Sequence, residues 1–169
     1  MGSRIFHHAG LAFCCRPRLS SNVGRHTLPV MILTLKVTLL SGANANGKWE
    51  GVIEIHSSST LEELHLEIQN SLNFDNDHYY EFYTARTERS RDRISFDEEN
   101  GEIYERTVES IYPLPERHSF YYLFDYGDHW LFRIARTKTA TQEPDPSINY
   151  PRLLSEAGER PEQYPSMED

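Results

Sequence analysis

The sequence predicts an α+β fold, in which one main helix packs on a curved, barrel-like and mostly antiparallel sheet. Aromatic residues, which favour strands, make up 12% of the 169 residues. Several segments alternate apolar and polar residues with the period of a half-buried strand, whereas one long segment has the apolar spacing of an amphipathic helix. No apolar run approaches the roughly 18 residues that a membrane span needs, so we expect no membrane partner.

The fold is expected to begin with a β-hairpin. Apolar and polar residues alternate over residues 33–39, which is the pattern of a strand with one buried face. A loop rich in Gly, Asn and Ala follows at 41–47, and the alternation resumes over residues 49–56. The two segments therefore predict two antiparallel strands joined by that loop.

The main helix is predicted directly after the hairpin. Thr60 and Glu63 have the spacing of a capping box, in which each side chain binds a backbone N–H at the helix start. An apolar stripe at helical spacing follows, and Asn73 is a suitable stop. The stripe consists of Leu61, Leu64, Ile68 and Leu72. Because a strand is predicted at 79–84, the order hairpin–helix–strand indicates a β-grasp-like start.

Further antiparallel strands are predicted to extend the sheet. A short strand is expected at 94–96, and one helical turn is expected at 107–112, before a pair of prolines. The aromatic segments 120–124 and 130–134 give the strongest strand signals. The turn between them contains Gly127, which we expect to supply a positive φ.

The sequence predicts one domain between two segments of different character. Residues 1–30 carry four arginines and no acid, which indicates a transit-like or disordered leader, or residues that precede a true start at Met31. Residues 31–140 hold the α+β domain. Residues 141–169 contain five of the nine prolines and are expected to form a tail with one short helix at 152–157.

Charge and cysteine content narrow the class of protein. Residues 31–169 hold 13 Lys and Arg against 26 Asp and Glu, a net charge of −13 that disfavours nucleic acid as a partner. Both cysteines, Cys14 and Cys15, precede Met31, so we expect no disulfide or thiolate metal site in the domain and a cytoplasmic location. The chain lacks the glycine-rich phosphate-binding motifs, so we expect no cofactor.

The nine residues 122–130 carry the most specific motif of the chain, aromatic-x-aromatic-Asp-aromatic-Gly-Asp-x-Trp. With the Thr-Leu-Glu-Glu-Leu helix start at 60–64, the Tyr-Glu-Phe strand at 80–82 and the Pro-Glu-Gln-Tyr segment at 161–164, the chain resembles the plasmid Ri Orf-three-like (pRiA-type) family. This bacterial family is uncharacterised, and some of its members are labelled transposon resolvase-like. The resemblance covers about residues 31–165 and implies an association with mobile elements.

The turn of this motif is the candidate site. Asp125, Asp128 and His129 lie in the turn, with Tyr122 and Trp130 on the strands that flank it. Two interpretations remain open. The carboxylates form a small acidic site for a hard cation or for acid–base chemistry, or they only accept hydrogen bonds from backbone N–H groups of the turn, with Trp130 in the core. We assign none of these residues as a metal ligand from the sequence.

Two other groups of side chains are candidate sites. Four arginines within eight residues suit phosphate groups, although Glu88 and Asp92 reduce the net charge to +2, so a solvated loop is the alternative. The four are Arg86, Arg89, Arg91 and Arg93. On the helix, Glu62 and His65 have a ligand-like spacing, and we expect them on its solvated face.

We predict a non-enzymatic module that binds an unknown protein or peptide partner through an exposed sheet edge or an aromatic groove. Tyrosine suits such an interface. The groove candidates are Tyr79, Tyr80, Tyr83, Tyr121 and Tyr122. Two alternatives remain open: a nucleic-acid-associated accessory of a mobile element that uses residues 86–93, and a metal-dependent hydrolase centred on Asp125, Asp128 and His129.

Overall fold

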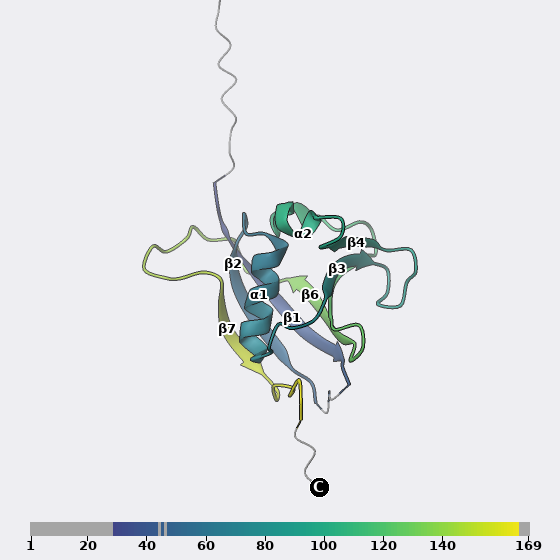
Figure 1. The fold of residues 1–169 in the computed structure, drawn as a ribbon. Helices are drawn as coiled ribbons and strands as arrows, with labels where there is room; N and C mark the ends of the chain where they lie inside the picture. The colour runs from purple at the N-terminus through teal and green to yellow at the C-terminus, as the bar shows by residue number, and fades with distance from the viewer. Residues whose placement is uncertain (1–28, 44, 46, 166–169) are drawn as a thin grey trace, which may run out of the picture.

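The computed structural model describes residues 29–43, 45 and 47–165 and shows an α+β fold (Figure 1). Seven strands form one sheet in the order β4-β3-β5-β6-β1-β2-β7, and every neighbouring pair is antiparallel. Helix α1 (Leu61–Leu72) lies across one face, and two short helices, α2 (Glu102–Glu105) and the 3-10 helix η1 (Glu109–Ile111), follow β4. The strands are β1 (Ile32–Ser41), β2 (Glu50–His56), β3 (Tyr80–Ala85), β4 (Ile94–Asp97), β5 (Ser119–Phe124), β6 (Trp130–Arg136) and β7 (Arg152–Ala157). The predicted class and the antiparallel sheet are confirmed.

The β1–β2 hairpin forms because both strands place alternate apolar side chains on one face. Leu33 is opposite Ile55 and Leu35 is opposite Ile53, and all four side chains are buried. Opposed apolar side chains of this kind stabilise a strand pair by direct contact. The hairpin that the alternation predicts is therefore present, with its buried face toward the core.

Helix α1 begins and ends where its capping residues predict. Thr60 Oγ1 accepts a hydrogen bond from the Glu63 N–H at 3.2 Å, and Glu63 Oε2 accepts one from the Thr60 N–H at 2.8 Å. Asn73 ends the helix in the left-handed conformation, with a φ of 60°. The apolar stripe is buried in the same core cluster as the strands, so α1 covers the main hydrophobic core.

The central strands β3 and β5 are buried on both faces. Phe82 and Tyr122 belong to the main core under α1. Tyr83 and Tyr121 belong to a second cluster of buried residues, and their rings stack with centroids 5.1 Å apart. A strand that is buried on both sides has a continuous apolar sequence instead of an alternating one. This double burial explains why residues 120–124 give such a strong strand signal.

The C-terminal segment corrects one prediction, because residues 152–157 form strand β7 and not a short helix. Strand β7 pairs with β2, where Arg152 Nη2 lies 2.7 Å from Glu54 Oε2 and Trp49 Nε1 donates to Glu156 Oε2 at 3.0 Å. A helix of one or two turns is not stable alone, whereas these long-range contacts stabilise a strand. The sheet thus continues into the segment that was expected to be a tail.

Two finer features of the predicted fold are not confirmed. Strand β6 lies beside β1 in the position where a β-grasp-like start would place β3. The sheet has two edges, β4 and β7, so within the described residues it is open and not barrel-like.

The predicted leader remains untested. Cys14, Cys15 and the rest of residues 1–28 lie outside the described residues, as do residues 166–169 of the predicted tail. In the part of the chain that the structure describes, no helix has the length and apolar character needed to cross a membrane.

Gly42, directly after β1, is required by the packing of Trp130. A Cβ at this position would lie 2.1 Å from the Trp130 ring. The Trp130 side chain is completely buried and its ring packs on Phe74, with centroids 5.0 Å apart. The ring therefore has no room to move away from an added methyl group.

Gly42→Ala is expected to lower the free energy of unfolding by about 3 kcal/mol, because overpacking displaces a fixed ring. Urea denaturation followed by tryptophan fluorescence checks the value. Gly47→Ala is the matched control, since a Cβ at Gly47 would have no neighbour within 4 Å. Equal unfolding midpoints for the two variants would contradict the packing argument.

Candidate functional site

The turn between β5 and β6 is held by the buried carboxylate of Asp125. Its Oδ1 accepts hydrogen bonds from the N–H groups of Gly127 at 2.8 Å and Asp128 at 3.3 Å. Gly127 does not supply the predicted positive φ; Asp125, with a φ of 54°, and His129, with a φ of 56°, adopt that conformation. Asp tolerates it because its short polar side chain bonds locally to the backbone. One oxygen of Asp125 therefore has the turn-stabilising role that the sequence offers as an interpretation.

Asp128 and His129 contact Asp125 through their backbone N–H groups, but no side chain of the other predicted site residues has a hydrogen bond or ion pair with it in the described part of the chain. Asp128 is half-buried, and its carbonyl accepts the Ala43 N–H at 2.8 Å, which joins the turn to the loop after β1. His129 is exposed at the surface of the turn. Tyr122 and Trp130 are completely buried in the main core. The structure thus gives these five residues separate roles.

The second oxygen of Asp125 contacts a group of side chains that the sequence reasoning missed. Asp125 Oδ2 lies 3.5 Å from His78 Nε2, and the same nitrogen lies 2.9 Å from the Tyr164 hydroxyl. The hydroxyl donates to Asp77 Oδ2 at 2.8 Å, and Gln163 Nε2 donates to Asp77 Oδ1 at 2.9 Å. Since Tyr164 donates its one proton to Asp77, it accepts from His78.

These hydrogen bonds also shift the pKa values of Asp77 and Tyr164. The hydrogen bond from Tyr164 lowers the pKa of Asp77, and the same bond raises the pKa of Tyr164 to about 12. The contacts join the β5–β6 turn, the segment before β3 and the residues near the C-terminus.

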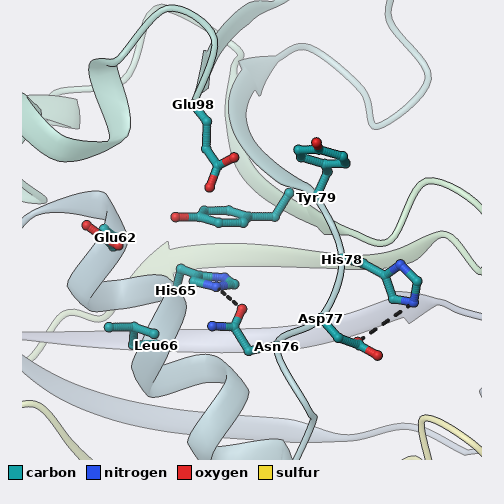
Figure 2. Close-up of a pocket in the computed structure, with 9 residues that line it drawn as sticks. Glu62, His65, Leu66, Asn76, Asp77, His78, Tyr79 and Glu98 are labelled. Carbon is teal, nitrogen blue, oxygen red and sulfur yellow. Dashed lines mark hydrogen bonds and ion pairs between the residues drawn. The ribbon is translucent and has the colours of Figure 1, made fainter.

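A pocket of about 450 Å³ lies beside this group (Figure 2). Helix α1 supplies Glu62, His65 and Leu66 to its wall, and residues 76–80 form a second wall. Glu98 directly follows β4. In Figure 2 its carboxylate points into the pocket from the side opposite Asn76. The volume is in the range of small-molecule pockets, which begin at roughly 300 Å³.

His65 is buried and not solvated, which corrects the prediction made for the Glu62–His65 spacing. Its side chain is 1% exposed, and its ring stacks on that of Tyr80 with centroids 3.5 Å apart and an interplanar angle of 1°. Glu62, one turn earlier, is half-buried at the pocket wall. The helix face that carries this pair therefore packs on the aromatic strands.

The hydrogen bonds of His65 determine its tautomer. Asn76 Oδ1 can only accept, so His65 Nε2 carries the ring proton and donates it there. In the neutral ring Nδ1 is then the acceptor, so the Tyr122 hydroxyl donates to it at 2.6 Å and itself accepts from Gln69 Nε2 at 2.8 Å. Burial lowers the pKa of His65 to about 4, so the ring is neutral at pH 7.

The pocket is acidic. Glu62, Asp77 and Glu98 line it, and none of the described Lys and Arg residues does. Burial, followed by the charges of Glu62 and Glu98, raises the pKa of Tyr80. A pocket with this lining attracts cations and repels anions. Across residues 29–43, 45 and 47–165, no group of three or more His, Cys, Asp or Glu side chains is arranged to hold a metal ion.

The tyrosines predicted to line a groove divide into two groups. Tyr79 and Tyr80 line the pocket. Tyr83, Tyr121 and Tyr122 are buried in the two hydrophobic clusters and present no surface to a partner. The aromatic part of the site is therefore confined to the start of β3.

The four arginines of the β3–β4 loop are not equivalent. Arg93 Nη2 lies 2.7 Å from Oε1 of the buried Glu81, and the guanidinium lies 4.6 Å from the centroid of the Tyr83 ring. All four arginines are exposed, Arg93 included. Arg93 differs in that it packs on the face of the sheet opposite α1, where its ion pair with Glu81 fixes its position.

Sequence reasoning missed Asp77, His78 and Glu98 as site residues. A local signal existed for two of them, because the polar run Asn76-Asp77-His78 directly precedes a strand that begins with tyrosine. No local signal identified Glu98, which reaches the pocket only because β4 pairs with β3.

Comparisons with known proteins bear on the family and the fold. The family profile described as plasmid pRiA4b ORF-3-like protein matches residues 32–164. A crystal structure from Methanosarcina mazei Go1, titled as the protein of unknown function MM3350, matches with a TM-score of 0.61 and 17% identity. The match covers 76% of this chain and 71% of that chain, and it shows a shared fold. The comparison with curated proteins finds no match.

Asp125→Ala is expected to lower the free energy of unfolding by about 2 kcal/mol, because two turn N–H groups lose their acceptor. Asp125→Asn keeps the Oδ1 acceptor and tolerates the positive φ, so its expected cost is below about 1 kcal/mol. Urea denaturation of both variants measures the difference. A larger loss for Asn than for Ala would contradict the role assigned to Oδ1.

His65 makes the stability depend on pH. Its pKa is about 4 in the folded protein against the ordinary histidine value of 6.5 in the unfolded chain, so between these values only the unfolded chain binds the proton. The free energy of unfolding is therefore expected to fall as the pH drops from 6.5 to 4, by up to about 3 kcal/mol from this group. Urea denaturation across this range checks it, with His65→Gln expected to show a shallower decline. Parallel pH profiles for the two proteins would refute the assignment.

Proposed function

The chain belongs to the plasmid pRiA4b ORF-3-like protein family, and we propose that it is a non-enzymatic module that binds a protein or peptide partner. The contact surface is the acidic pocket together with the exposed tyrosines around it. The segment of the partner that meets this surface carries positive charge.

The observation that carries the proposal is the position of the exposed tyrosines. The described residues contain four, with exposed fractions from 48% to 73%, which we name the tyrosine rim: Tyr79, Tyr104, Tyr126 and Tyr164. Tyr79 lines the pocket. The hydroxyls of Tyr104 and Tyr164 donate to Glu98 at 3.4 Å and to Asp77 at 2.8 Å, and both acids belong to the pocket wall.

The fourth member extends the tyrosine rim beyond the pocket. Burial and the charges of Glu81 and Asp97, with a smaller effect of Glu98, raise the pKa of Tyr126, and the charge of Arg93 lowers it. The four tyrosines come from the start of β3, from α2, from the β5–β6 turn and from the C-terminal segment. Their grouping therefore results from the fold and not from neighbouring positions in the sequence.

Exposed tyrosine is suited to a protein interface. Its ring offers a large apolar contact, its hydroxyl bonds to polar groups, and its ordering costs little conformational entropy. The acids of the pocket and the net charge of −13 over residues 31–169 select a basic partner and accelerate its association. Tyrosine and acid together thus support a basic protein segment as the occupant.

The tyrosine rim is favoured over a sheet edge as the contact. At β4, the Asn100 side chain accepts from the Asp97 N–H at 3.2 Å and donates to the Ser95 carbonyl at 3.1 Å. These edge groups are therefore already bonded. At the other edge, β7 carries the charged side chains Arg152 and Glu156, and charge on an edge strand discourages pairing with another chain.

Binding of a basic peptide is expected to depend on the tyrosine rim. The probe is a fluorescein-labelled peptide with Arg and Lys at alternate positions, compared with its Glu-substituted counterpart by fluorescence anisotropy. The wild-type protein should bind the basic peptide alone, and Tyr79→Ala/Tyr126→Ala should weaken binding by about tenfold, because interface tyrosines carry a large share of binding energy.

Leu154→Ala, which removes an exposed apolar side chain on β7, is the control and should leave the affinity unchanged. Equal binding of the basic and the acidic peptide, or an equal loss in the control, would refute the proposed function.

A further inference from the structure

The hydroxyl of Tyr80 lacks a hydrogen-bond partner among the described residues. Tyr80 is 6% exposed, and its side chain is a wall of the pocket. Its ring is fixed by the stack on His65, at 3.5 Å between centroids. The ring is therefore held in place, and its hydroxyl, which is accessible from the pocket, keeps its hydrogen-bonding capacity for a ligand.

Two carboxylates accompany this hydroxyl. Glu62 lies on α1 and Glu98 lies in the turn after β4, so they approach from different elements (Figure 2). Both residues line the same pocket as Tyr80, and after burial their charges are the next largest causes of its raised pKa. Neither carboxylate has an ion pair with Lys or Arg in the part of the chain that the structure describes.

The floor of the pocket does not oppose a cation. The imidazole of His65 carries no charge at pH 7, because burial holds its pKa at about 4. It gives its ring proton to Asn76 and faces Tyr80 with its ring, so it presents no positive group to the space above. The hydroxyl of Tyr80 and the two carboxylates are thus three oxygen acceptors around one aromatic space.

We propose that Tyr80, Glu62 and Glu98 form a receptor for an organic cation, an ammonium or guanidinium group. The inference rests on the proposed function in naming the source of the cation, which is a Lys or Arg side chain of the partner. Aromatic rings and carboxylates are the usual recognition elements for such groups. A pocket of about 450 Å³ has room for the group and for part of its aliphatic chain.

Small cations separate this receptor from the tyrosine rim. Ethylguanidinium and propylammonium are titrated into the full-length protein, and the amide and aromatic resonances of His65 and Tyr80 are followed by NMR. Saturable shifts of these resonances are expected for at least one of the two cations, and the cation that binds more tightly identifies the group.

Three variants test the acceptors. Glu62→Gln/Glu98→Gln is expected to weaken binding of the cation by about tenfold or more, because bonds to charged acceptors are the stronger ones. Tyr80→Phe keeps the stack on His65 and is expected to weaken binding by about threefold to tenfold. The control Glu143→Gln/Glu159→Gln changes the net charge equally at two exposed positions and should have no effect. Thermal unfolding by circular dichroism shows that each variant is folded.

The possible results give different conclusions. Shifts that remain in Glu62→Gln/Glu98→Gln, or an equal loss in the control, would overturn the receptor. Binding of the peptide that depends on the tyrosine rim, without binding of either small cation, would overturn it while leaving the proposed function in place. Binding of a small cation without binding of the peptide would retain the receptor, assign it to an unattached amine or guanidine, and refute the proposed function.

Discussion

The position of α1 on the sheet depends on the buried hydroxyl of Tyr122. This group lies inside the core, where it accepts from Gln69 and donates to His65. A shift of α1 by one residue would remove both partners and leave a buried hydroxyl unbonded, which is costly in an apolar interior. The hydrophobic stripe of α1 provides most of the burial, but this polar contact selects one position for the helix.

The pocket follows from that selected position. With His65 held by Tyr122, its ring becomes the surface on which Tyr80 stacks, and Glu62 is carried to the rim one turn away. The opposite side is built by contacts between distant segments, since Asp77 bonds with Gln163 and Tyr164. The site is therefore assembled from segments that are distant in the sequence. Hydrogen bonds hold these segments together, and the acidic residues line the open side of the pocket.

Much of the fold could be predicted because its signals are local. The alternation over 33–39 and the capping box at Thr60 each report a physical requirement of one element. Strand β7 could not be predicted, because the six residues acquire their conformation only from pairing with β2. The site was predicted in part: the Asp125 carboxylate was identified, but its contact with His78 depends on how the turn meets the segment before β3. The burial of His65 was missed because helical spacing alone does not reveal what a neighbouring strand places against a polar residue.

Strand β7 has a consequence for how the chain is made. Its partner β2 leaves the ribosome well before β7, since the paired residues Glu54 and Arg152 are 98 positions apart in the chain. Until then β2 is an uncovered strand, and the indole of Trp49 lacks the acceptor that Glu156 provides. Pairings between such distant segments form slowly, since a long loop must close first. Until β7 has been synthesised, β2 therefore has an unpaired edge, and such an edge favours pairing with other chains.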